Sequence, residues 1–206
     1  MLGVFLRTTL RTTLRTTVAL ALVAPLATPA RAQGGAAPAA ASLRADASGR
    51  ATTVVTLNPS RAEGQARPAP LRIAIDYGQP HARGRQVVGG LIPTGTVWRT
   101  GANAATSLTT DVDLLIGDTR VPKGVYTLFT LATPSGWKLI INRQTGQWGT
   151  EYKPEQDLAR VDLKARTLRE PVESFTIWLV PGTAGQGALR MAWGDRELST
   201  DWRLAP

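Results

Sequence analysis

The chain has 206 residues, of which 43% are hydrophobic and 19% are charged, and it contains no cysteine and a single histidine. This composition is that of an ordinary globular protein, which excludes wholesale disorder, collagen-like repetition and a polytopic membrane protein. Because cysteine is absent, the protein has no disulfide, thiolate metal site or cysteine nucleophile, and the lone His81 excludes a site built from several imidazoles.

The net charge of +9 is concentrated near the N-terminus. Residues 1–32 contain four arginines and no acidic residue, which leaves 20 basic and 15 acidic side chains for residues 33–206. Nucleic-acid-binding proteins usually gather Lys and Arg on one element, and this chain has no such element in its remaining sequence. We therefore expect no nucleic-acid partner.

The first 32 residues have the three parts of a secretory signal peptide. A basic stretch over 1–17 precedes an apolar run over 18–26, and Ala30-Arg31-Ala32 offers a cleavage site with small residues at the required positions. The apolar run is shorter than the roughly 20 residues that a membrane-spanning helix needs. The sequence therefore predicts an exported protein, periplasmic or extracellular, with no transmembrane anchor after cleavage.

The rest of the chain divides into a linker and one domain. Residues 33–50 are rich in Ala, Gly, Pro and Ser and contain no aromatic residue, which predicts a flexible linker. From residue 51 onward, short apolar or alternating runs are separated by turn residues, so we expect a single β domain over 51–206. The predicted strands are 52–57, 71–77, 106–110, 112–116, 125–131, 137–142, 160–163, 175–180, 188–193 and 197–204.

This pattern is typical of an all-β protein, and we predict an antiparallel β-sandwich of about ten short strands. The turn at Thr133-Pro134-Ser135-Gly136 makes 125–131 and 137–142 an antiparallel hairpin. Phe129 is expected to face the core together with Leu139 and Ile141. A helical turn is expected only at 153–158 or near Val97.

A glycine-rich stretch over 77–103 is the most unusual part of the chain. Six glycines within 27 residues permit tight turns and close backbone approach, while Pro80 and Pro93 add stiffness. Long loops of this kind inside a compact domain are commonly functional. The predicted ligand-binding set consists of Trp148, of Asp76 directly before this region, and of Tyr77, His81, Arg83, Arg85, Arg99 and Asn103 within it.

Several segments carry a resemblance to a known family. They are residues 75–80, 83–85, 89–93, 122–130 and 147–149, together with Val97-Trp98-Arg99-Thr100-Gly101-Ala102-Asn103. These segments resemble the secreted bacterial domain of unknown function 2911. They occur in the same order as in that family, with little insertion, over about residues 51–206. The resemblance implies an exported, sandwich-like β domain whose activity is not established. Family members typically have Glu directly after the Asn of this motif, whereas this chain has Ala104, so it lacks an acid at that position.

These residues are compatible with two main functional hypotheses. The first and favoured one is a non-catalytic binding or envelope-associated module, in which the loop, Arg99, Asn103 and Trp148 bind a carbohydrate, a cell-wall fragment or a small anion. The second is a hydrolase that uses Asp76 and His81 as acid and base, oriented by Arg99 and Asn103. A third hypothesis, a structural protein that self-associates through an uncovered sheet edge, also stays open.

The same residues have structural interpretations. Arg99 either binds an anion or pairs with Asp76 in the interior. Asp111, Asp113 and Asp118 lack the spacing of a calcium loop, so we assign no metal ligand, no cofactor and no catalytic residue. Most of the six tryptophans are expected in the core, with Trp148 partly exposed.

Overall fold

The computed structural model describes residues 44–206 of the chain. The predicted signal peptide over 1–32 and the first part of the linker, 33–43, lie outside the described residues. The domain is almost entirely β-structure, with the strands β1 (Arg50–Leu57), β2 (Leu71–Gly78), β3 (Val97–Trp98), β4 (Thr106–Thr110), β5 (Leu114–Ile116), β6 (Thr119–Val121), β7 (Gly124–Thr133), β8 (Gly136–Asn142), β9 (Asp157–Pro181) and β10 (Gln186–Leu204).

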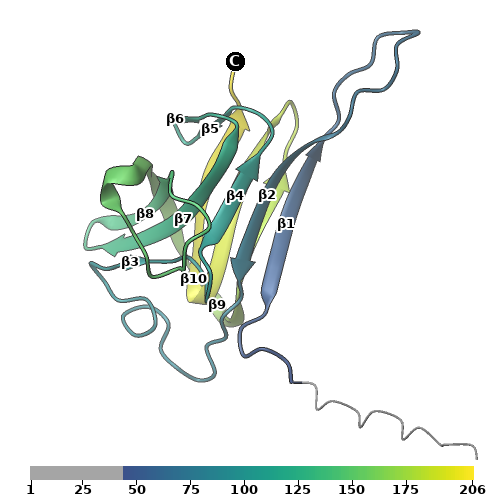
Figure 1. Ribbon diagram of the computed structural model, residues 1–206. Coiled ribbons are helices and arrows are strands. Elements are labelled where there is room, and N and C mark those ends of the chain that lie inside the picture. The colour runs from purple at the N-terminus through teal and green to yellow at the C-terminus, as the bar shows by residue number, and fades with distance from the viewer. Residues whose placement is uncertain (1–43) are drawn as a thin grey trace, which may run out of the picture. The chain divides into compact units, whose positions relative to one another are not determined.

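The strands follow one antiparallel path in the order β1-β2-β4-β7-β8-β9-β10-β5-β6, and β3 pairs with β7. In Figure 1 the yellow-green β9 and β10 run behind the layer formed by β1, β2, β4 and β7. Both layers contribute to one hydrophobic core. The prediction of an all-β antiparallel fold of about ten strands is confirmed. A single turn of 3-10 helix, Pro154–Gln156, lies where the sequence predicts a helical turn, and no helix within residues 44–206 is long and apolar enough to span a membrane.

In the strands of the first layer, apolar and polar residues alternate, and this alternation determines which face of each strand is buried. In β2, Ile73 and Ile75 are buried in the core, whereas Arg72 on the opposite face is exposed. Successive side chains of a strand point to opposite faces, so a sequence of this kind buries one face and leaves the other in solvent.

The hairpin of β7 and β8 differs from the expectation in one respect. Leu139 and Ile141 do belong to the shared core, but Phe129 pairs with Ile140 and lies on the opposite face. The ring of Phe129 packs edge-to-face against Tyr152 at a centroid distance of 4.8 Å. The prediction for Phe129 is wrong because the chain after β8 covers that outer face, and both faces of the hairpin are therefore buried.

The last two strands are longer than expected. The four short strands predicted after residue 160 are parts of β9 and β10, which have 25 and 19 residues. The pairing of β9 with β10 shifts register on both sides of Gly194, whose φ is +56°. A bulge of this kind bends a strand pair without ending it.

The free edge of β9 is covered by neighbouring side chains and by the glycine-rich loop. The backbone N–H of Phe175 donates to the carbonyl of Pro80 at 2.9 Å, and that of Ile177 donates to the Tyr77 hydroxyl at 3.1 Å. The N–H of Leu179 donates to the Thr53 hydroxyl at 3.2 Å. These bonds hold the loop against β9 and occupy donors that an exposed edge would offer to another strand.

Candidate functional site

Asp76 and His81 have separate partners. Asp76, on β2, forms an ion pair with Arg50 and accepts a hydrogen bond from the Thr52 hydroxyl at 2.9 Å. The Nδ1 atom of His81 lies 2.8 Å from the hydroxyl oxygen of Ser174 on β9. Each predicted acid–base partner is thus held by a different group, and neither is held by the other.

Arg83 and Arg85 fix the shape of the loop. The backbone N–H of Arg83 donates to the Glu173 carboxylate at 2.7 Å, which suits the positive φ of 50° at this residue. The Arg85 guanidinium donates to the carbonyls of Ala82 and His81 at 2.9 and 2.8 Å. Both arginines therefore contribute to local structure.

The residues directly before β1 bind to the same loop. The Arg83 guanidinium donates to the Ala47 carbonyl at 2.8 Å, and the Asn103 amide donates to the Ser48 carbonyl at 3.2 Å. The Gly49 carbonyl accepts from the N–H of Gln79 at 2.7 Å. Residues 47–49 belong to the predicted linker, and in the structure they lie across the loop and occupy two side chains of the predicted ligand-binding set.

Tyr77 is a core residue, with 3% of its surface exposed. Its hydroxyl is the acceptor for Ile177, and its ring packs edge-to-face on Phe175. These contacts give Tyr77 a structural role that joins β2 to the edge of β9.

Arg99 is half-buried and has no acidic partner among the described residues. Its side chain is half-buried, and its Nε donates to the Gly101 carbonyl at 3.3 Å. Within residues 44–206 no ion pair includes Arg99, so the expected alternative, a pair with Asp76, is not formed. A half-buried arginine without a carboxylate partner can bind an anion.

The backbone around Arg99 is strained. Thr100 is fully buried with a φ of 51°, a conformation that β-branched residues rarely adopt, and Asn103 has a φ of 61°. The Thr106 hydroxyl donates to the Thr100 carbonyl at 2.7 Å and helps to hold this conformation. Strained residues of this kind are concentrated at ligand-binding and active sites.

A cavity with a volume of about 270 Å³ lies beside Arg99. Trp98 and Arg99 come from the motif described above, and Phe129 from the outer face of β7. Leu91 comes from the glycine-rich loop, and three further residues come from residues 143–157, which we call the cover segment. The full lining is Leu91, Val97, Trp98, Arg99, Phe129, Gly149, Thr150 and Tyr152.

Gly149 allows the cover segment to approach Arg99. A side-chain carbon at this position would lie 2.5 Å from Cδ of Arg99 and 2.6 Å from the carbonyl oxygen of Asn103. The N–H of Gly149 donates to that same carbonyl at 3.1 Å. The preceding Trp148 is 51% exposed, which confirms the expected partial exposure.

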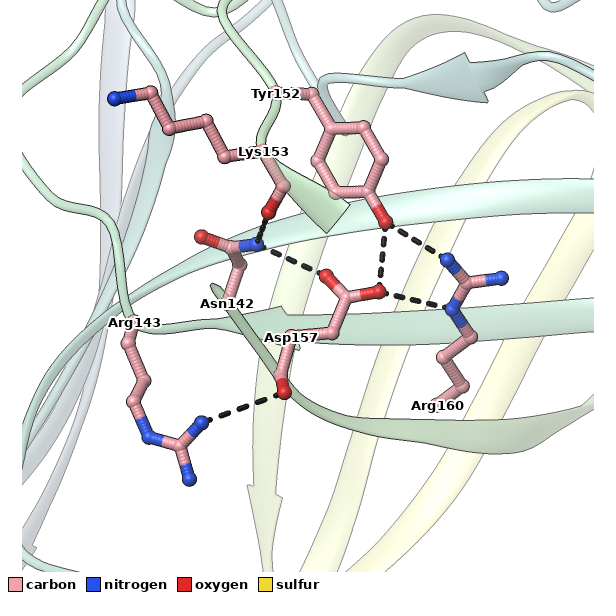
Figure 2. A network of polar contacts seen from close by, with 6 residues as sticks. All are labelled: Asn142, Arg143, Tyr152, Lys153, Asp157 and Arg160. Atoms are coloured by element: carbon pink, nitrogen blue, oxygen red, sulfur yellow. Dashed lines mark hydrogen bonds and ion pairs between the residues drawn. The ribbon is translucent and has the colours of Figure 1, made fainter. Parts of the chain in front are cut away.

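Figure 2 shows the hydrogen bonds that hold Tyr152, one of the residues that line the cavity. Its hydroxyl donates to the Asp157 carboxylate at 2.7 Å and accepts from the Arg160 guanidinium at 2.9 Å. Burial, together with the Asp157 carboxylate, raises the pKa of Tyr152 to about 12. The phenol is therefore neutral near pH 7 and acts as a fixed wall.

Asn142 anchors both ends of the cover segment (Figure 2). It is completely buried, and its amide donates to the Lys153 carbonyl at 2.8 Å and to the Asp157 carboxylate at 2.9 Å. Its own carbonyl accepts from the N–H of Gln144 at 2.9 Å. A fully satisfied buried amide of this kind fixes one arrangement of the chain. Sequence reasoning missed Asn142, Thr150 and Tyr152, and the one available signal was the polar Asn142 at the end of an apolar strand.

The described residues contain no group of three or more His, Asp or Glu side chains that could hold a metal ion. Asp113 accepts from the N–H of Lys123 at 2.8 Å and from Arg120 at 2.7 Å, and these two donors lower its pKa. Asp111 accepts from the N–H of Arg72 at 2.8 Å. These two carboxylates therefore serve as acceptors that connect strand ends.

Comparison with known protein families identifies the family of this chain. The model of the family described as "Protein of unknown function (DUF2911)" matches residues 60–201. No curated protein and no solved structure matches the chain. The matched range includes the Arg99 motif, the hairpin of β7 and β8 and the whole cover segment. The chain therefore belongs to the DUF2911 family.

Proposed function

We propose that this protein is an exported, non-catalytic binding module whose Arg99 cavity binds an acidic sugar, a sugar ring that carries a carboxylate. The observation that carries the proposal is the half-buried Arg99 guanidinium, which has no carboxylate partner among residues 44–206 and lines an aromatic cavity. A carboxylate satisfies such a guanidinium through charge-assisted hydrogen bonds.

The walls and the size of the cavity support a single ring as ligand. Trp98 and Tyr152 supply aromatic surface beside the buried Phe129, and Thr150 adds a hydroxyl. Aromatic rings pack well against the apolar face of a sugar. The volume of about 270 Å³ lies below the range of about 300–1,000 Å³ that is usual for larger ligands.

The chemistry of the cavity favours binding over catalysis. Arg99 and Tyr152 are its only titratable lining residues. Tyr152 has a pKa of about 12, so it is a poor general base near neutral pH. Asp76 and His81, which a hydrolase would use, are engaged with Arg50 and Ser174 and do not line the cavity.

Binding is tested by calorimetry with glucuronate and with glucose, which differ in the carboxylate. We expect glucuronate to bind at least tenfold more tightly, because charge-assisted hydrogen bonds contribute about 1.5–3 kcal/mol. Arg99→Met keeps the apolar stem against Gly149 and should abolish this difference. Arg72→Met, which removes an exposed arginine on β2, is the matched control and should retain it. Equal affinity for both sugars, or undiminished discrimination by Arg99→Met, would overturn the proposal.

Export is tested separately on the protein produced in a Gram-negative host. The three-part pattern of residues 1–32 is the feature that motivates this part of the proposal. We expect N-terminal sequencing of the periplasmic fraction to begin at Gln33. Recovery of the uncleaved chain from the cytoplasm alone would reject export and leave the sugar site to be judged on its own.

A further inference from the structure

β1 is an edge strand of the sheet. Within residues 44–206 it pairs only with β2, through eight residue pairs without a register shift. In Figure 1 it is the outermost strand of the first layer. An edge strand presents a row of backbone N–H and C=O groups to which another strand can bind. β1 contributes no residue to the Arg99 cavity.

The backbone groups of Thr52, Val54 and Thr56 point away from β2. On the other side of β2, the Arg72 carbonyl accepts from the N–H of Asp111 at 2.9 Å, so every second β2 residue counted from Arg72 directs its backbone groups toward β4. The intervening β2 residues bond to β1, where their partners are Ala51, Thr53, Val55 and Leu57. Within residues 44–206, no hydrogen bond reaches the outward backbone groups of Thr52, Val54 or Thr56.

β1 lacks the features that protect the other edges of the sheet. From residue 51 to residue 57 it has no charged residue, no proline and no bulge. At the opposite end of the strand order, β6 has only three residues and carries Arg120. Beyond the end of its pairing with β8, β9 carries Lys164, Arg166, Arg169 and Pro171. Short length, charges and proline prevent edge-to-edge pairing, so β1 is the edge that is open to a partner strand.

The sequence of β1 is complementary to a second copy of itself. When two β1 strands lie antiparallel about a two-fold axis at Val54, Val54 meets Val54 of the second copy, and Thr52 meets its Thr56. The residues that exchange backbone bonds are then all uncharged and β-branched, a favourable combination across strands. Val54 is 50% exposed in the single chain, and this contact covers it. Arg50, the one charged residue of β1, lies outside the paired stretch and keeps its ion pair with Asp76.

The charges on the outer face of the sheet favour this register. Across the sheet from Thr56 lies Arg72, which forms no ion pair within residues 44–206. Across from Thr52 lies Asp76. Pairing about the central valine therefore puts Arg72 in one cross-strand row with Asp76 of the second copy. A register that pairs Thr56 with Arg50 of the second copy would put two arginines in that row instead.

We infer that the protein forms a two-fold dimer by antiparallel pairing of β1 with β1 of a second copy, which continues the first layer across both subunits. The outward N–H and C=O groups of Thr52, Val54 and Thr56 supply the hydrogen bonds. Two short strands bury less surface than a permanent interface, so we expect a reversible dimer with a dissociation constant between about 1 µM and 1 mM. This inference goes beyond the proposed sugar binding and does not depend on it.

Sedimentation equilibrium of the purified protein between about 1 µM and 1 mM measures the association. Val54→Lys puts two ammonium groups opposite each other and should weaken association about tenfold or more. Because Val54 is half-exposed, this variant is expected to fold, which circular dichroism checks. Val125→Lys is the matched control. Val125 is 48% exposed in the same cross-strand row, but it lies on the interior strand β7, so this variant should associate like wild type.

Disulfide cross-linking tests the register directly, because the chain contains no cysteine of its own. Facing residues of a hydrogen-bonded pair have Cα atoms about 5.5 Å apart, within the range of about 4.4–6.8 Å that a disulfide spans. Val54→Cys should therefore give a covalent dimer under mild oxidation. Thr52→Cys alone should not, but a mixture of Thr52→Cys and Thr56→Cys should. Val125→Cys is the control and should remain uncross-linked.

Three results would overturn the inference. They are a monomer at every concentration, no covalent dimer of Val54→Cys, and equal weakening by Val54→Lys and Val125→Lys, which would place the contact on the outer face of the sheet. Arg99→Met should dimerise like wild type whether or not it binds glucuronate, so failure of the dimer and failure of the sugar site are distinguishable.

Discussion

Gly149 illustrates how one small residue defines the candidate site. Its backbone contacts both the stem of Arg99 and the carbonyl of Asn103, at distances that leave no space for a side chain. Glycine is required at position 149 because of this close approach, which brings the cover segment against the strained Arg99 motif. The two sequence motifs that contain Arg99 and Gly149 therefore meet in space to form one wall of the cavity.

Tyr152→Phe should weaken ligand binding through loss of positioning. Phenylalanine keeps the packing against Phe129, but it loses the bonds to Asp157 and Arg160. We expect a loss of about 1.5–3 kcal/mol in the free energy of unfolding, the usual contribution of hydrogen bonds to charged groups. We also expect lower glucuronate affinity, because the wall of the cavity is less firmly held. Urea unfolding and calorimetry measure the two effects.

The matched control is Tyr126→Phe, which removes a hydroxyl that donates to the Pro122 carbonyl at 2.8 Å. Tyr126 does not line the cavity. This variant should lose about 1 kcal/mol, typical of one neutral hydrogen bond, and retain wild-type affinity. If both variants bind glucuronate equally well, Tyr152 supports the fold alone and has no positioning role.

Among the elements, the strands of the first layer could be predicted closely because alternation is a local property. The run 71–77 was expected as a half-buried strand, and the structure has β2 over Leu71–Gly78 with the expected buried face. In contrast, the four runs after residue 160 merge into β9 and β10, because the intervening residues continue to pair across a bulge. A bulge preserves hydrogen bonding where the sequence shows only turn-like residues.

The candidate site could be predicted only in part, since its residues depend on contacts between distant segments. Arg99 was recognised from its motif, and the structure places it at a cavity. Arg83 and Asn103 were expected beside it, but they bind the carbonyls of Ala47 and Ser48. No sequence pattern in a stretch rich in alanine indicates that its end will lie across a loop. Tyr152 was missed for the same reason, because its partner Phe129 was assigned to the opposite face of the sheet.

At the scale of the whole molecule, the buried carboxylate of Glu197 joins the two long strands. Its ionisation makes the stability of the fold depend on pH. Glu197 on β10 is 5% exposed and accepts hydrogen bonds from Arg166 on β9 at 2.6 Å and from Arg190 on β10 at 3.0 Å. The bond from Arg166, opposed in part by burial, lowers the pKa of Glu197. A carboxylate with a lowered pKa in the folded state stabilises the fold at neutral pH.

Glu197→Gln should therefore destabilise the protein at neutral pH and have little effect in acid. In the folded protein the pKa lies below the ordinary value of 4.5, so the stabilisation is fully present above about pH 4.5. It is lost as the pH falls through the lowered pKa, where the wild-type side chain becomes neutral like glutamine. At pH 7 we expect a loss of about 1.5–3 kcal/mol, the usual contribution of hydrogen bonds to a charged group. Urea unfolding of both proteins at pH 7 and at stepwise lower pH measures the difference, with Asp162→Asn, at an 85% exposed side chain, as the control that should change little at any pH. A difference between wild type and Glu197→Gln that does not shrink as the pH falls would show that the variant disturbs packing and that the Glu197 charge does not contribute to stability.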